Sequence, residues 1–89
     1  MQEIHIYVSG KVQGVGFRML VKRHALLHNI KGFVRNLADG RVEICAQGLG
    51  DQIQEFIRTV QEKPGLALIS GIETRYQPVV ETFSSFEVW

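Results

Sequence analysis

Cysteine is nearly absent from this sequence, and long apolar runs and secretion signals are absent altogether. The only cysteine is Cys45, so no disulfide can form within the chain, which is typical of a reducing compartment. Residues 1–5 lack the basic region and apolar run of a secretion signal, and we therefore expect a cytoplasmic location. Nowhere do 18 apolar residues run together, so no membrane-spanning segment is predicted.

The chain also lacks an excess of charge of either sign. The formal net charge is +1, which argues against the strong positive field typical of proteins that bind nucleic acid or anionic membranes. With 89 residues, 45% of them hydrophobic, the chain can build one two-layer core. Because no linker, repeat or low-complexity tract interrupts it, we expect a single domain over residues 1–89, and we expect it to be a monomer.

The hydrophobic pattern changes period along the first half of the chain. Residues 4–8 alternate between apolar and polar, which predicts a strand with one buried face. Apolar residues in the segment 17–28 recur at helical spacing, and residues 31–36 return to a strand pattern. Residues 39–40, Asp-Gly, are typical of a hairpin turn, and a third strand is predicted over residues 41–47 with alternate side chains facing outward.

The second half repeats this order. Asp51 and Gln54 have the spacing of a capping box, which predicts the start of a helix that ends at the Pro-Gly pair 64–65. A fourth strand is predicted within residues 68–76 and a short last one at residues 86–89. The whole order predicts an α+β, ferredoxin-like βαββαβ sandwich with a short extra C-terminal strand, in which two helices cover one face of a mainly antiparallel sheet.

Three glycines, Gly10, Gly14 and Gly16, lie between the first strand and the first helix. Glycine allows a loop to adopt positive φ and to turn successive amides toward one point, where no side chain obstructs a ligand. The first N–H groups of the following helix have no intrahelical partner and carry the positive end of its dipole. The segment therefore predicts a binding site for a small oxyanion such as phosphate.

Arg18 adds a permanent positive charge in the first helical turn, and its planar guanidinium can bind two oxygens at once. Two better-known phosphate loops are excluded, because Gly16 is followed by Phe17-Arg18 rather than Lys-Ser/Thr, and Met19 stands where a dinucleotide fingerprint needs glycine. The residues alone are also consistent with a tight turn whose arginine only faces solvent.

A second polar residue is placed near this loop by topology. If a right-handed helical crossover joins the first two strands, they run in the same direction and end on the same side of the sheet. The loop then lies near Asn36, which ends the second strand and could hold a water molecule through its amide. The alternative is that Asn36 only caps the turn that follows.

These segments carry a family resemblance. Residues 10–18, GKVQGVGFR, and residues 32–36, GFVRN, are followed by Gly40-Arg41-Val42 and by Gly48. In these motifs and in length the chain resembles the acylphosphatase family, small enzymes that hydrolyse the anhydride between a carboxylate and phosphate. The resemblance covers essentially the whole chain.

The resemblance implies a metal-independent acylphosphatase in which Asn36 orients a water for in-line attack on the bound phosphate. It implies no cofactor, an acyl phosphate as substrate and phosphate as product. The low net charge independently predicts neither nucleic acid nor membrane as a partner. By the same resemblance the phosphate is held by Arg18 and by the main-chain amides of Gln13, Gly14, Val15, Gly16, Phe17 and Arg18.

Other sites are disfavoured by spacing. Cysteine-dependent phosphatases place an arginine six positions after the nucleophile, whereas Asp51 follows Cys45 at that distance. His24 and His28 have a spacing compatible with a shared metal, but no third ligand accompanies them, and we expect them to pack against the sheet.

Two alternative functions share the expected fold. An RNA-recognition module has the same order of elements, but it needs aromatic residues on the third strand, and residues 41–47 contain none. Acylphosphatase-like domains also occur in hydrogenase-maturation proteins that use carbamoyl phosphate, and such a domain would favour that substrate.

Overall fold

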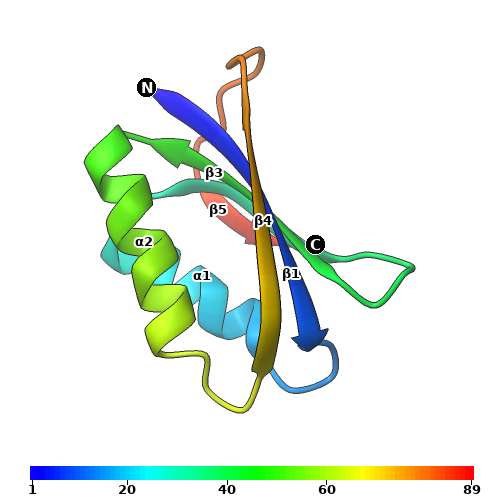
Figure 1. The fold of residues 1–89 in the computed structure, drawn as a ribbon. Helices are drawn as coiled ribbons and strands as arrows, with labels where there is room; N and C mark the ends of the chain where they lie inside the picture. Colours follow the sequence, from blue (N-terminus) through cyan, green and yellow to red (C-terminus); the bar gives the residue numbers. More distant parts are fainter.

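The computed structural model describes residues 1–89 and contains five strands and two helices (Figure 1). In chain order they are β1 (Gln2–Lys11), α1 (Phe17–Leu27), β2 (Lys31–Asn36), β3 (Val42–Gly48), α2 (Gly50–Glu62), β4 (Leu68–Gln77) and β5 (Phe86–Val88). The predicted ferredoxin-like order is confirmed, including the short extra strand at its end.

The strands form one sheet in the order β4-β1-β3-β2-β5. β3 lies between β1 and β2 and is antiparallel to both, so β1 and β2 run in the same direction. β4 pairs antiparallel with β1, whereas β5 pairs parallel with β2. The carboxyl ends of β1 and β2 therefore lie at the same end of the sheet, as the crossover argument predicts.

Both helices cover one face of the sheet (Figure 1). The alternating residues Ile4, Ile6 and Val8 of β1 point toward the helices and are fully buried, together with Val21 of α1 and Phe56 of α2. Burial of each such side chain stabilises the fold by roughly 1.5–3 kcal/mol. This shared core fixes the start of α1 relative to the ends of β1 and β2.

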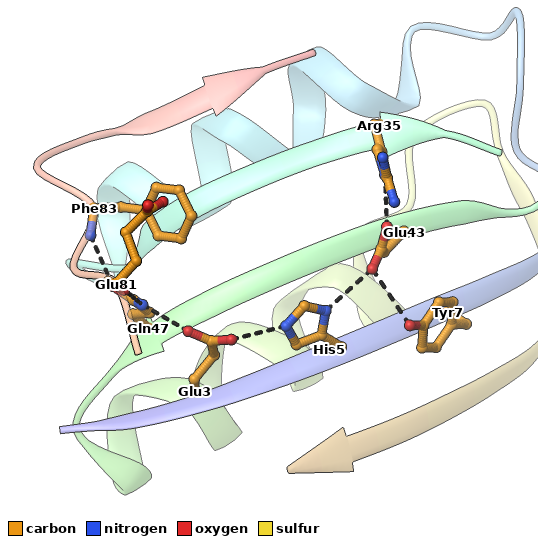
Figure 2. A network of polar contacts seen from close by, with 8 residues as sticks. All are labelled: Glu3, His5, Tyr7, Arg35, Glu43, Gln47, Glu81 and Phe83. Atoms are coloured by element: carbon orange, nitrogen blue, oxygen red, sulfur yellow. Dashed lines mark hydrogen bonds and ion pairs between the residues drawn. The ribbon is translucent and has the colours of Figure 1, made fainter. Parts of the chain in front are cut away.

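The opposite face of the sheet is less open than the strand pattern predicts. Glu43, Cys45 and Gln47 do lie on this outer face, but each is no more than 4% exposed. The segment after β4 crosses over Gln47, whose Nε2 donates to the Glu81 carbonyl at 2.6 Å and whose Oε1 accepts from the Phe83 N–H at 3.0 Å (Figure 2). Glu43 instead bonds to the side chains of His5 in β1 and Arg35 in β2. Contacts with segments distant in sequence thus bury side chains of β3 that the alternating strand pattern predicts to be exposed to solvent.

The helices are short, with 11 residues in α1 and 13 in α2. α2 begins at Gly50, where Gln52 Oε1 accepts a hydrogen bond from the Leu49 N–H at 3.2 Å. The predicted capping pair of Asp51 and Gln54 is therefore wrong by two residues, and Asp51 instead accepts from the N–H of Gln52 at 2.9 Å. Neither helix has both the length and the apolar character needed to cross a bilayer.

Candidate active site

The glycine-rich segment contains glycines of two kinds. Gly10 belongs to β1, at an irregularity in its pairing with β4, and a Cβ there would lie 2.1 Å from the Leu68 carbonyl oxygen. Gly14 and Gly16 lie in the loop beyond the strand, each with φ of 75°, and nothing lies within 4 Å of an added Cβ. Gly10 thus allows close strand packing, whereas Gly14 and Gly16 shape an open loop.

The main-chain amides of this loop have no partners within the protein. No N–H group from Gln13 to Met19 donates a hydrogen bond to a main-chain or side-chain acceptor. The first bond at this end of α1 runs from the Leu20 N–H to the Gly16 carbonyl at 3.2 Å, and no side chain caps the helix. Unpaired amides at the positive end of a helix dipole form an anion-binding site.

Side chains of the same loop hold it in place. Gln13 Nε2 donates to the carbonyl oxygens of Leu37 at 2.8 Å and Arg41 at 2.9 Å, which ties the loop to the turn between β2 and β3. Val15 packs against the core, and Phe17 is only 2% exposed. Because these side chains are occupied elsewhere, they offer a ligand only their main-chain amides.

Arg18 is oriented by the end of the chain. Its Nη1 donates a short hydrogen bond to the main-chain oxygen of Trp89. Trp89 is itself anchored, because its N–H donates to the Val34 carbonyl at 2.8 Å and its ring stacks on Phe33 with centroids 3.8 Å apart. The guanidinium has five N–H donors, so most of them remain available to an oxyanion.

Asn36 is the last residue of β2 and is exposed. Its side chain makes no hydrogen bond within the protein, and the following turn is closed by other groups: the Leu37 N–H donates to the Arg41 carbonyl at 2.8 Å, and Asp39 pairs with Arg41 at 2.8 Å. The alternative in which Asn36 only caps this turn is therefore not supported. Its amide is free to hold a water molecule.

A cavity of about 190 Å³ lies where the loop, the start of α1 and the end of β2 meet. Five of the residues predicted from the sequence line it: Gly14, Gly16, Phe17, Arg18 and Asn36. Gln13 and Val15 do not, because their side chains turn toward the neighbouring hairpin and the core. A water molecule takes up about 30 Å³ in the liquid, so the cavity has room for several of them or for a small oxyanion.

Three further residues line the cavity and were not predicted: Val12, Met19 and Val88. Met19 follows Arg18 in the first helical turn, so proximity in sequence was a usable signal. Val88 reaches the site because β5 pairs parallel with β2 and places Val88 opposite Val34. No local pattern near residue 88 indicates that pairing.

The chemistry of the lining is restricted. It contains no histidine, cysteine, aspartate or glutamate, so it provides neither the usual metal ligands nor a protein side chain suited to general base catalysis. Arg18 is its only charged residue. The arrangement can hold a multivalent oxyanion and place one water beside it.

Cys45 lies on the outer face of the sheet, away from this cavity. Burial, together with the nearby Glu3 and Glu43 carboxylates, raises the pKa of its thiol to about 12. The thiol is therefore protonated at neutral pH, which disfavours a role as a nucleophile.

His24 and His28 join the two helices. Nε2 of His24 donates to the Lys63 carbonyl at 2.9 Å. His28 Nε2 donates to Thr59 Oγ1 at 2.9 Å, since the hydroxyl proton of Thr59 is already donated to a carbonyl of α2. Both histidines thus bond to α2 or to the residue that follows it, and His24 lies on the buried face of α1.

The chain is similar to known proteins over nearly its whole length, including every residue that lines the cavity. The acylphosphatase family model matches residues 4–88. An acylphosphatase of Archaeoglobus fulgidus is 46% identical over 88 residues, which are 99% of this chain and 98% of that protein. The crystal structure of an acylphosphatase from Bacillus subtilis is 34% identical with a TM-score of 0.94, and the match covers 100% of this chain and 99% of that one.

A larger protein contains a similar domain. The crystal structure of HypF from T. kodakarensis matches 100% of this chain with 39% identity and a TM-score of 0.91. The match covers only 12% of that HypF chain.

Proposed function

The chain belongs to the acylphosphatase family, hydrolases that act on acyl phosphates, and from this premise we propose how its site performs the reaction. The phosphoryl group of the substrate lies in the cavity between the Gln13–Arg18 loop and the end of β2. The loop amides and the Arg18 guanidinium donate hydrogen bonds to its oxygens. The observation that supports this placement is the row of amides without internal partners beside the only charged side chain of the cavity.

Asn36 holds the attacking water on the opposite side of the phosphoryl group from the leaving carboxylate. Phosphoryl transfer requires mainly positioning and electrostatic stabilisation of the equatorial oxygens. Donors that are already fixed in the free protein stabilise the equatorial oxygens without reorganisation during the reaction. The amide of Asn36, which no other group in the protein engages, positions the water.

The reaction is an in-line displacement at phosphorus. The water oxygen forms a bond to phosphorus while the bond between phosphorus and the acyl oxygen breaks, and the carboxylate leaves with that electron pair. A carboxylate is a good leaving group, so no general acid is required. Because the lining contains no carboxylate, imidazole or thiol, the proton of the water passes to an oxygen of the phosphoryl group.

Hydrolysis of benzoyl phosphate tests this proposal when a phosphate monoester is assayed beside it. We expect rapid hydrolysis of the acyl phosphate in the presence of a chelator, inhibition by inorganic phosphate, and no comparable hydrolysis of the monoester. Activity that disappears with the chelator, or equal activity on both substrates, would contradict the mechanism.

A second candidate comes from the similarity to a segment of HypF. If the chain works like the carbamoyl-phosphate-using domains that it resembles in sequence, carbamoyl phosphate should be preferred over benzoyl phosphate by a wide margin. An RNA-recognition role is less well supported, because such modules stack bases on an open sheet face, whereas Phe83 and Glu81 lie across the outer face here.

A further inference from the structure

The outer face of the sheet contains a second cavity, of about 330 Å³. Glu3, His5 and Cys45 line it together with apolar side chains that include Phe33 and Phe83. Glu3 and His5 come from β1 and Cys45 from β3, where the pairing of the strands places Cys45 opposite His5. Polar ligands surrounded by apolar side chains are typical of metal sites in proteins.

The three side chains are close enough to share one ion. Their ligand atoms all lie within 4.8 Å of one another. A tetrahedral zinc ion has bonds of about 2.0–2.3 Å, which places neighbouring ligand atoms roughly 3.3–3.8 Å apart. Thiolate, imidazole and carboxylate are all zinc ligands, and the thiolate disfavours magnesium and calcium. We propose that Glu3, His5 and Cys45 form a binding site for one thiophilic divalent cation of the zinc type, with a water in the fourth position.

The groups behind these ligands already have the arrangement that metal sites need. His5 Nδ1 lies 3.0 Å from Glu43 Oε2, which leaves Nε2 directed at Glu3 in the cavity (Figure 2). Metal-binding histidines usually donate their second N–H to a carboxylate in this way. Glu43 is fixed in turn by Arg35, whose Nε donates to Glu43 Oε1 at 2.6 Å.

Glu3 is held in a comparable way. Gln47 Nε2 donates to Glu3 Oε1 at 2.7 Å, so Oε2 remains for the cavity. That second oxygen accepts from His5 Nε2 at 2.8 Å, and the Cys45 sulfur lies within 4.8 Å of the facing ligand atoms of both residues. A divalent cation takes the place of the Nε2 proton and of the thiol proton, and both are released to solvent.

A metal ion can reach this site from solvent, and the site is separate from the proposed active site. The Glu3 and His5 side chains are 12% and 19% exposed, so an ion can enter past them although Cys45 is buried. His5 lies in β1, seven residues before Val12, which directly follows that strand, and seven residues of extended chain span about 23 Å at roughly 3.3 Å per residue. No residue lines both cavities, and metal binding can be measured without an activity assay.

Cobalt(II) absorption tests the proposal on the intact chain after treatment with a chelator. We expect one equivalent to bind and to produce a thiolate-to-cobalt charge-transfer band that added zinc removes. Cys45→Ser should abolish the band, and Glu43→Gln, which removes only the carboxylate behind His5, should weaken binding by about 10–100-fold. His28→Gln is the matched control, because that histidine bonds to α2 and should leave binding unchanged.

Absence of the charge-transfer band in the unaltered chain would overturn the proposal, whatever the variants do. Binding that is weakened as much by His28→Gln as by His5→Gln would also overturn it. Circular dichroism of each variant identifies loss of fold, and Cys45→Ala provides a second probe should the serine variant unfold.

Discussion

The two polar regions of this protein differ in how their hydrogen-bonding groups are used. On the outer face of the sheet, Glu43 accepts from His5, Arg35 and Tyr7, so nearly every polar atom has a partner within the protein (Figure 2). At the end of β1 and β2, the amides of the Gln13–Met19 segment and the Asn36 side chain have none. Buried polar groups that are paired stabilise a structure, whereas unpaired donors at an open cavity are available to a ligand. The comparison predicts catalytic losses from changes at the cavity and stability losses from changes on the outer face.

Arg18→Ala should have the largest effect. Charge-assisted hydrogen bonds contribute about 1.5–3 kcal/mol each, so loss of two lowers kcat/KM by roughly 10²–10⁴-fold. Inhibition by inorganic phosphate should weaken as well, because the same bonds hold the product. Arg75→Ala is the control, since Arg75 is an exposed residue of β4 that contacts Glu73 and the Tyr7 ring and does not line the cavity. Steady-state kinetics on benzoyl phosphate with added phosphate measure both quantities, and unchanged phosphate inhibition would contradict the role of Arg18.

Asn36→Ala should separate binding from turnover. We expect kcat to fall by about 10²-fold, because a misplaced nucleophile has a cost of this order. The inhibition constant of phosphate should stay close to that of the unaltered protein, since the loop amides and Arg18 are intact. The same kinetic assay measures the two constants, and near-normal turnover would show that Asn36 does not position the water.

Glu43→Gln should affect stability and leave the catalytic constants of the folded protein unchanged. The Glu43 side chain is only 6% exposed and its carboxylate accepts from three side chains, so we expect a loss of about 2 kcal/mol in the free energy of unfolding. Urea denaturation in the presence of a chelator measures this loss. A comparable fall in kcat/KM at full folding would remove the distinction between the two regions.

The stability that Glu43 contributes should also depend on pH. Burial by itself would raise the pKa of Glu43, but hydrogen bonds from His5 and Arg35 hold it below its ordinary value of 4.5. A carboxyl group with a lowered pKa in the folded state stabilises the protein above pH 4.5, and this stabilisation is lost as the pH falls further. The difference between the unaltered chain and Glu43→Gln should therefore shrink below pH 4.5. A difference that stays constant at acid pH would mean that the charge of Glu43 is not responsible.

Much of the site could be predicted because the signals are local. Gly14, Gly16 and Arg18 lie within five residues at a strand-to-helix junction, and the physics of a helix N-terminus applies there in almost any fold. Gly10 could not be interpreted in this way. It belongs to the same motif, but glycine is required there because β4 packs too closely to leave room for a side chain. Val88 shows it again, because it lines the cavity only through pairing with a strand far away in sequence.

The order of elements, the glycine-rich loop before α1 and the placement of Asn36 beside it were determined by the amino-acid sequence alone, because periodicity, backbone freedom and crossover direction act over short stretches. Only the tertiary structure decided that the outer face of β3 is buried, that Glu3 and His5 meet Cys45 in a cavity, and that Trp89 orients Arg18. The physical reason is that these contacts join residues 34 or more positions apart. Strand register and the path of the segment after β4 set such distances, and no local pattern encodes them.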